Sequence, residues 1–154
     1  MKIALAQLNP LIGDLQGNAK QIIATSKKAI KQGADVILTP ELSLWGYPPR
    51  DLLLDSTRCN QQDEILNQIA DTLDKEASNS ILLVGIAEQA PDYQLPRLFN
   101  SIVLITNGNW KVVARKQLLP TYDVFDEKRY FRPAQATSII HLKAKGQTLK
   151  VGIT

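Results

Sequence analysis

The chain has 154 residues, of which 44% are hydrophobic and 21% are charged, which suits one globular domain and argues against disorder. Its 18 basic and 15 acidic residues give a net charge of only +3, spread along the chain, so no dense basic stripe indicates nucleic-acid binding. A single cysteine and a single histidine exclude a disulfide framework and argue against a zinc site of ordinary ligand type.

An apolar run at residues 2–8 (KIALAQL) opens the chain and predicts a short buried strand, which Asn9 and Pro10 end. This run is too short for a signal peptide or a membrane span. We therefore expect a cytoplasmic protein with no membrane partner.

A helix is predicted next, because six apolar residues share one helical face: Leu15, Ala19, Ile22, Ile23, Ala29 and Ile30. Gly33 follows as the residue that stops this helix. Residues 35–39 (DVILT) then predict a second short strand, and Glu41 lies just beyond its carboxyl end.

Residues 42–56 (LSLWGYPPRDLLLDS) predict a loop, because glycine, proline and aromatic residues are frequent in them. A second helix is predicted after this loop, with Cys59 just before its start. Its apolar face contains Ile65, Leu66, Ile69, Leu73 and Ala77. Residues 80–87 (SILLVGIA) predict a third buried strand.

Two hairpins complete the predicted elements. Residues 99–106 and 110–116 are β runs joined by an Asn-Gly turn, and residues 138–144 pair with 148–154 in the same manner. Strands that first alternate with helices and then follow one another predict an α/β fold with a mixed sheet. No linker interrupts the pattern, so residues 1–154 are treated as part of one domain.

Two of the predicted strand ends carry ionisable groups. Ligands of open α/β sheets bind beyond the carboxyl ends of strands, where Glu41 follows one strand and Lys116 follows another. A carboxylate there can act as a general base, and an ammonium can stabilise an oxyanion. Taken alone, both residues are more typical of solvated surface positions, so their spacing does not make the pair catalytic.

Three segments resemble the nitrilase-like carbon–nitrogen hydrolases: the opening KIALAQLNPLIGDLQGN, residues 40–53 (PELSLWGYPPRDLL) and residues 114–133 (ARKQLLPTYDVFDEKRYFRP). The longer forms GYPPRDLL and YDVFDEKRYF resemble the glutaminase part of glutamine-dependent NAD synthetases. The resemblance covers essentially the whole chain. It implies a nitrilase-like αββα sandwich, incomplete here at its C-terminal end.

This resemblance also implies a Glu–Lys–Cys triad that hydrolyses glutamine, with Glu41 as the general base and Lys116 as the triad lysine. Glu41 and Lys116 are then expected to converge at the carboxyl ends of neighbouring strands, around a cavity lined by Tyr47 or Tyr122. The nucleophilic cysteine is expected a few residues beyond KVGIT, so we expect a truncated front part of the domain that is inactive alone. Cys59 lies between the two motifs and does not match the nucleophile.

Two tyrosines match substrate-binding positions of the same family. Tyr122 matches a residue that helps to bind glutamine, and Tyr47 matches one that lines the same pocket, although ordinary packing would also explain either ring. The charged residues between 123 and 128 are expected to be solvated or mutually paired in the pocket wall. His141 alternates with apolar residues and is interpreted as a strand-face residue.

The partners implied by the resemblance are L-glutamine and a synthetase domain of the same chain, within a homo-oligomer. No cofactor is expected in this segment. ATP and magnesium are expected in the synthetase domain, which is absent from the sequence and which would convert nicotinic acid adenine dinucleotide to NAD with the released ammonia.

Two alternatives remain open from the sequence. The first is another branch of the same superfamily, such as an amidase or a carbamoylase, in which Glu41 and Lys116 would serve equally well. The second is a non-catalytic α/β binding or scaffold module, since the sequence lacks a cysteine that matches the triad nucleophile. Activity with glutamine compared with carbamoyl amino acids would separate the two enzymes.

Overall fold

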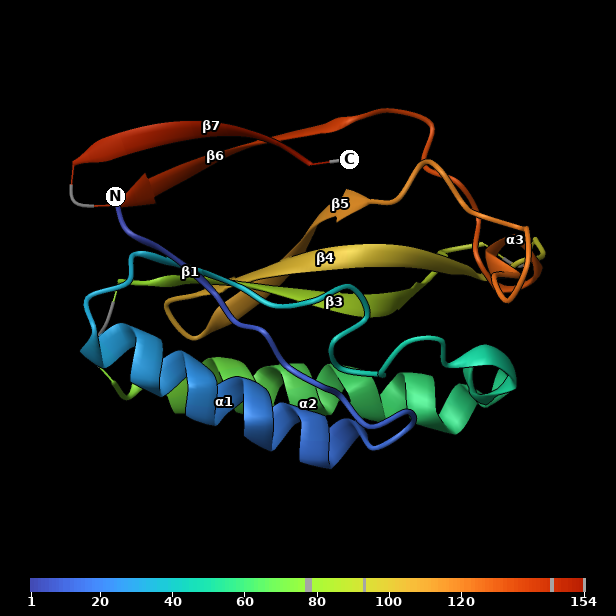
Figure 1. Ribbon diagram of the computed structural model, residues 1–154, viewed down its shortest axis with the longest axis horizontal. Helices are drawn as coiled ribbons and strands as arrows, with labels where there is room; N and C mark the ends of the chain where they lie inside the picture. Colours follow the sequence, from blue (N-terminus) through green and yellow to red (C-terminus); the bar gives the residue numbers. More distant parts are fainter. Residues whose placement is uncertain (77–78, 93, 145, 154) are drawn as a thin grey trace.

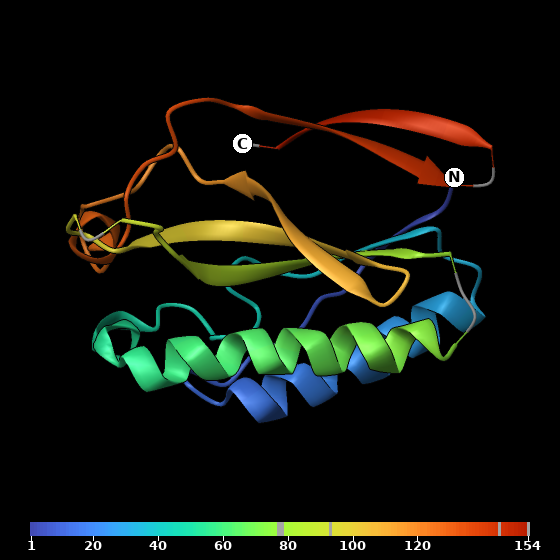
Figure 2. The ribbon, with the colours of Figure 1, turned by 180° about the vertical axis from the view of Figure 1, so that it is seen from behind.

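The computed structural model describes residues 1–76, 79–92, 94–144 and 146–153. Three layers lie on top of one another: a pair of helices, a five-stranded sheet and a two-stranded sheet (Figures 1 and 2). The layers therefore follow an α–β–β order, which agrees with three layers of the expected αββα sandwich. The described residues supply no second layer of helices.

The central sheet is mixed, as the sequence predicts. Its strand order is β1-β2-β3-β4-β5, in which β1 (Ile3–Leu5), β2 (Val36–Leu38) and β3 (Ile81–Gln89) are parallel. Strands β4 (Leu98–Thr106) and β5 (Asn109–Arg115) continue the sheet in antiparallel pairs. Strands β2, β3 and β5 consequently point the same way, and their carboxyl ends lie at one edge.

Helices α1 (Leu15–Lys31) and α2 (Ser56–Asp74) cover one face of this sheet (Figure 2). Each begins at an aspartate whose side chain accepts a hydrogen bond from the first turn: Asp14 from the Gly17 amide and Asp55 from the Thr57 amide. Their apolar faces build the main core with the sheet, in which Ile22, Leu66 and Ile69 are almost fully buried. No helix among the described residues is both long and apolar enough to cross a membrane.

The start of α2 corrects one prediction. Cys59 lies inside this helix rather than before it, because Asp55 caps the helix four residues earlier than the cysteine. The predicted apolar face is confirmed for Ile65, Leu66, Ile69 and Leu73, all of which are buried. Ala77, the last residue assigned to that face, lies outside the described residues.

A second, smaller core separates the two sheets. The hairpin of β6 (Ser138–Ala144) and β7 (Gln147–Ile153) forms the third layer above the central sheet (Figure 1). Buried apolar residues from both sheets meet there: Val36, Ile81, Leu83, Leu104 and Leu142. The last predicted hairpin is thus confirmed, and His141 lies on its exposed surface.

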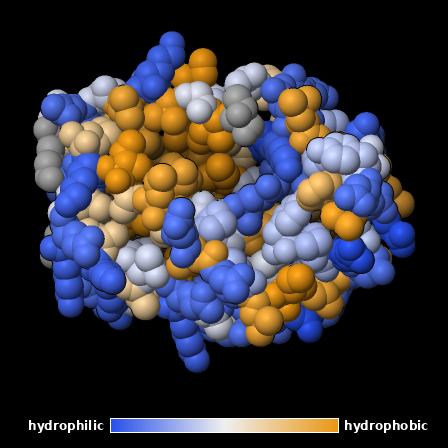
Figure 3. All heavy atoms as spheres, viewed as in Figure 1, coloured by the Kyte–Doolittle hydropathy of each residue, from blue (hydrophilic) through white to orange (hydrophobic). Residues whose placement is uncertain are grey.

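The first strand was predicted to be buried, and this prediction is wrong. Ile3 is 52% exposed and Leu5 is 69% exposed. These residues pair with Val36 and Leu38 and point towards the face of the second sheet, but β1 is the edge strand, where the described part of the chain leaves that face uncovered. Figure 3 shows the result as an apolar hollow next to β1, beneath the β6–β7 hairpin.

Candidate active site

Glu41 and Lys116 meet at the carboxyl edge of the central sheet. The Lys116 ammonium Nζ lies 2.7 Å from Glu41 Oε1. The prediction that the two side chains converge is confirmed, but their strands are not neighbours. Glu41 follows β2 and Lys116 follows β5, and the hairpin of β3 and β4 lies between these strands in the sheet.

A loop that crosses β3 closes the distance between β2 and β4. Gly85 of β3 has no side chain, and a Cβ atom there would lie 2.4 Å from the Leu42 nitrogen and 2.7 Å from the Pro40 oxygen. The Leu44 amide in turn donates a hydrogen bond of 3.2 Å to the Gly85 carbonyl. Only glycine lets the loop lie this close to the strand, and the loop places Glu41 above β4.

On β4, Asn100 contacts both members of the pair. Its side-chain nitrogen Nδ2 donates a hydrogen bond of 2.5 Å to Glu41 Oε1. Its backbone carbonyl accepts a hydrogen bond of 2.8 Å from the Lys116 amide. Asn100 is only 5% exposed, and nothing in the sequence pattern distinguished it from other strand residues.

Lys116 also pairs with a second carboxylate that sequence reasoning missed. Glu127 Oε1 lies 3.0 Å from Lys116 Nζ and accepts a hydrogen bond of 2.7 Å from the Tyr47 hydroxyl. Glu127 was expected in a charged segment whose residues are solvated or mutually paired in the pocket wall, yet it is 4% exposed and pairs with Lys116. The segment forms one helical turn, α3 (Glu127–Tyr130), which buries Glu127 and Tyr130 on the same side. Their spacing of three residues was the available signal.

Charge compensation sets the protonation of this network. Burial opposes the charge on Lys116, but hydrogen bonds and charges from Glu41 and Glu127 outweigh it and raise the pKa of the ammonium. Burial, together with the hydrogen bond and charge of Glu127, also raises the pKa of the Tyr47 hydroxyl. At neutral pH the site therefore holds a cationic lysine and a neutral tyrosine.

A cavity of about 250 Å³ opens at this ion pair. Polar groups of Glu41, Asn100 and Lys116 line it together with apolar residues of the second core, including Leu38 and Ile102. Neither Tyr47 nor Tyr122 lines the cavity, so this part of the prediction is wrong. The reason is that buried Glu127 lies next to Lys116 and accepts a hydrogen bond from the Tyr47 hydroxyl, which holds that ring away from the cavity.

Both tyrosines lie outside this cavity. Tyr47 lines a separate pocket of about 480 Å³ with Glu127 and Phe125. Tyr122 is 70% exposed, and its ring contacts Phe125 edge-on with 5.6 Å between the ring centroids. Phe125 also lies 6.2 Å from the Tyr47 ring, so it connects the two predicted substrate-binding residues.

A one-residue irregularity in β5 sets the direction of Lys116. The register between β4 and β5 shifts at Ile102 and Val103, which leaves Val113 as an extra residue on β5. Val112 packs against the main core, between the helices and the central sheet, whereas Val113 packs against the second core. With strict alternation Lys116 would share the face of Val112. The bulge turns it to the cavity between the sheets.

Cys59 does not belong to this cavity. It is 4% exposed and lines a different pocket, with Leu53 and Pro96. Burial raises the pKa of its thiol, which lies 3.9 Å from the Leu53 carbonyl oxygen. A buried, protonated thiol is a poor nucleophile at neutral pH.

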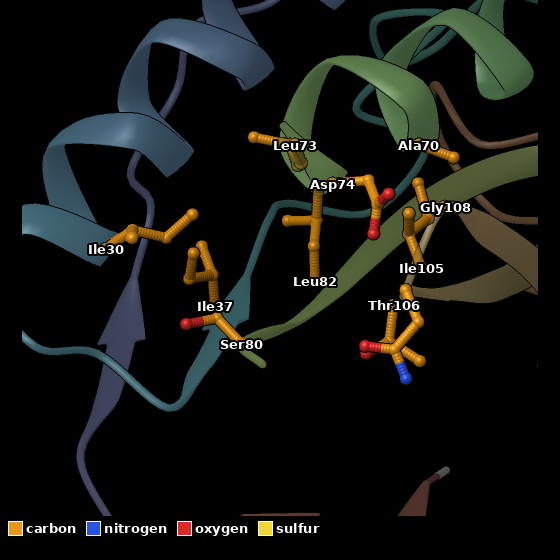
Figure 4. Close-up of a pocket in the computed structure, with 11 residues that line it drawn as sticks. Ile30, Ile37, Ala70, Leu73, Asp74, Ser80, Leu82, Ile105, Thr106 and Gly108 are labelled. Carbon is orange, nitrogen blue, oxygen red and sulfur yellow. The ribbon is translucent and has the colours of Figure 1, made fainter. Parts of the chain in front are cut away.

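Other candidate sites are less suited to chemistry. Figure 4 shows a cavity between α1, α2 and the sheet, lined mainly by apolar residues such as Ile37 and Leu82, with Asp74 at one side. Its volume of about 20 Å³ admits no more than a water molecule. Within the described ranges, no group of three or more histidine, cysteine, aspartate or glutamate residues is placed to hold a metal ion.

The layered α–β–β fold with a glutamate and a lysine paired at one sheet edge defines a hydrolase-like α/β domain of the nitrilase type. The sequence model of the carbon–nitrogen hydrolase family matches residues 2–153, and the chain belongs to that family. Glutamine-dependent NAD(+) synthetase of Synechocystis sp. is 43% identical to it over 152 residues, which are 99% of this chain and 26% of that protein. The chain thus spans about a quarter of the length of the curated relatives it matches.

Solved structures agree with this assignment. Glutamine-dependent NAD+ synthetase of Acinetobacter baumannii superposes with a TM-score of 0.76 at 34% identity, over 97% of this chain and 26% of that chain. An amidase of Nesterenkonia sp. AN1, with acrylamide added at its active-site cysteine, superposes with a TM-score of 0.71 at 25% identity. That match covers 97% of this chain and 56% of the amidase.

Proposed function

We propose that the chain is the front part of a glutaminase domain that hydrolyses L-glutamine to glutamate and ammonia. The observation that carries this proposal is the ion pair of Glu41 and Lys116 in a cavity at the carboxyl edge of the sheet. The similarity to glutamine-dependent NAD synthetases over nearly the whole chain supports glutamine as the amide.

The residues in hand account for two of the three roles in amide hydrolysis through a thioester. Glu41 takes the proton of a cysteine thiol, and the thiolate attacks the carboxamide carbon of glutamine. Lys116 stabilises the negative oxygen of the tetrahedral intermediate, a kind of contact whose loss costs about 3–4 kcal/mol of barrier in enzymes. Glu41 returns the proton to the departing ammonia and then activates the water that cleaves the thioester.

The nucleophile in this scheme is a cysteine outside the present sequence. Cys59 is buried in another pocket, and the structurally similar amidase carries acrylamide on an active-site cysteine. The ammonia would be used by a synthetase domain of the same protein, in an ATP- and magnesium-dependent amidation of nicotinic acid adenine dinucleotide to NAD.

Two variants of the full-length protein test the assignment. Glu41→Gln should abolish NAD synthesis from glutamine and retain synthesis from added ammonia, because the carboxylate serves only the hydrolysis of glutamine. Lys116→Ala should behave in the same way, since the oxyanion loses its cationic partner.

A matched control is Lys27→Ala, which removes a surface lysine that pairs with Glu76 at 2.8 Å on the helical layer. This control should retain both activities. An equal loss of glutamine-dependent and ammonia-dependent synthesis in the Glu41 and Lys116 variants would contradict the proposed roles.

A second candidate function is hydrolysis of another amide. The structural similarity to the Nesterenkonia amidase favours it, because that similarity extends over 97% of this chain and includes the sheet edge with Glu41 and Lys116. Rates with glutamine, simple aliphatic amides and carbamoyl amino acids separate the two. The first proposal predicts that glutamine is the preferred substrate of the full-length protein.

A further inference from the structure

Asn100 is the residue through which Glu41 and Lys116 are held together. It lies on β4 and is 5% exposed, between the strands that lead to the two site residues. Its side-chain amide donates to Glu41 Oε1, and its backbone carbonyl accepts from the Lys116 amide. One residue thus fixes the carboxylate through its side chain and the lysine through its main chain.

We propose that Asn100 is a positioning residue that anchors one oxygen of Glu41 and leaves the other to accept the proton of the nucleophile. This inference rests on the proposed glutaminase function and extends it. Asn100 itself touches no reacting atom and acts through Glu41.

The hydrogen bonds of Glu41 distinguish its two oxygens. Oε1 accepts from Asn100 at 2.5 Å and from Lys116 at 2.7 Å. Within the part of the chain that the structure describes, Oε2 has no hydrogen-bond partner. An oxygen that already accepts two short hydrogen bonds, one from a cation, is a weaker proton acceptor than its free neighbour. The proton therefore goes to Oε2.

The position of Glu41 also requires an anchor. Its side chain is 44% exposed, and Glu41 lies in a turn beyond the end of β2 rather than within a strand, so without a fixed contact it would sample several rotamers. Lys116 cannot supply this contact alone, because it also holds Glu127. The amide of Asn100 comes from a buried strand position and is therefore the rigid partner.

Asn100→Ala removes the contact to Glu41 and keeps the contact to Lys116, because the backbone carbonyl remains. In the full-length enzyme, kcat for glutamine hydrolysis should fall by about tenfold to a hundredfold, since misplaced catalytic groups cost rates of this order. KM for glutamine should change little. NAD synthesis from added ammonia should keep its wild-type rate.

The pH profile of kcat/KM supplies a readout that a purely structural role would not move. Loss of this hydrogen-bond donor disfavours the charged form of the carboxylate, so the acidic limb should move to higher pH. The charged and titratable groups around Glu41 are Lys116, Glu127, Tyr47 and Arg115, and none of them is altered by the substitution.

Asn18→Ala is the matched control. Asn18 is a buried asparagine on α1 that is 1% exposed and bonds to the backbone of Leu11 and Leu44, not to Glu41. This variant should lower the thermal unfolding temperature and leave the acidic limb in place. Asn100→Asp, which keeps the shape of the side chain and replaces the donor by a second carboxylate, should move the limb at least as far as Asn100→Ala. If the alanine variant does not fold, the acidic limb of the Asn100→Asp enzyme tests the role of Asn100 instead.

Failure of the inference about Asn100 can be distinguished from failure of the proposed function. If Glu41→Gln abolishes glutamine hydrolysis but both Asn100 variants retain the wild-type kcat and acidic limb, Asn100 does not position the base and this inference is overturned. If Glu41→Gln itself leaves glutamine hydrolysis intact, the proposed function fails and the role of Asn100 fails with it.

Discussion

One ammonium group joins two carboxylates of unequal burial at the centre of the site. The side chain of Glu127 is 5% exposed and that of Glu41 is 44% exposed, while both contact Lys116 through a single oxygen. A buried carboxylate with two donors is held in place, whereas a half-exposed one can exchange protons with a substrate. This difference in burial suits Glu127 to holding Lys116 and supports the role in chemistry that we propose for Glu41.

Replacing Glu127 by glutamine should test this division in the full-length protein. The pKa of Lys116 is raised by both carboxylates, so removal of one charge should lower it and move the alkaline limb of the kcat/KM profile to lower pH. Glutamine hydrolysis should fall about tenfold or more, because the cation that we propose to stabilise the oxyanion is displaced. The measurement is the rate of ammonia release as a function of pH.

The neighbouring substitution Asp126→Asn controls for a lost charge in the same segment. Asp126 is exposed and makes no side-chain hydrogen bond at the start of α3. The alkaline limb of the kcat/KM profile of the Asp126→Asn enzyme should match that of the wild type. A Glu127→Gln enzyme with the same limb would show that Lys116 does not depend on this carboxylate.

At the scale of the elements, two irregularities build the site from regular strands. The bulge at Val113 turns Lys116 towards the cavity, and the close crossing at Gly85 carries Glu41 over β3. Neither could be predicted from the sequence. A bulge depends on the register with the partner strand, and the need for Gly85 depends on a loop that lies more than forty residues earlier in the chain.

Insertion of one alanine between Ala114 and Arg115 should turn Lys116 to the helix side of the sheet, because it moves the lysine one place along the strand and away from its position beside Asn100. The ion pair with Glu41 would then be lost, and with it the hydrolysis of glutamine, while ammonia-dependent synthesis should persist. Val113→Ala keeps the number of residues and should retain most of the activity. Wild-type hydrolysis in the insertion variant would mean that the alternation along β5 does not orient Lys116.

Gly85→Ala should displace the loop that carries Glu41, because the added Cβ would meet the backbone of Leu42 and Pro40 rather than a flexible side chain. We expect a loss of about 1–3 kcal/mol in the free energy of unfolding, the usual cost of overpacking, and a lower kcat for glutamine. Gly152→Ala is the comparison, since that strand glycine has open space around it. Equal stability of the two variants in chemical denaturation would refute the steric argument.

At the scale of the whole molecule, the pattern of apolar residues predicted every helix and strand of the three layers, because the helices have one apolar face and the central strands, which are covered on both faces, are short apolar runs. The helical faces of α1 and α2 and the two hairpins are where the sequence indicates. Burial was not predictable for β1, whose apolar residues give the same pattern whether or not another layer covers them. The site was predicted as a pair of residues and observed as a network, since Glu127 and Asn100 become neighbours of Lys116 only through the fold.

Association of this 154-residue chain by itself follows from its uncovered surfaces. Ile3, Leu5 and Ile139 are each more than half exposed, and the β6–β7 sheet has outer edges with no strand partner among the described residues. Exposed edges and apolar patches promote intermolecular pairing. Sedimentation at increasing concentration should show assemblies larger than a monomer, and Ile139→Lys should reduce them. A monomer at all concentrations would contradict this expectation.

The same chain alone should not release ammonia from glutamine. Its single cysteine, Cys59, lies within α2, is 4% exposed and has a raised pKa, so the thiol stays protonated at neutral pH. It lines a different pocket from Glu41 and Lys116, and a nucleophile must lie within hydrogen-bond reach of its base to be activated. The measurement is ammonia formation by the purified chain, with Cys59→Ser as the control. Release above the buffer rate that disappears in the Cys59→Ser chain would identify Cys59 as a nucleophile and overturn the assignment of that role to a cysteine outside this sequence.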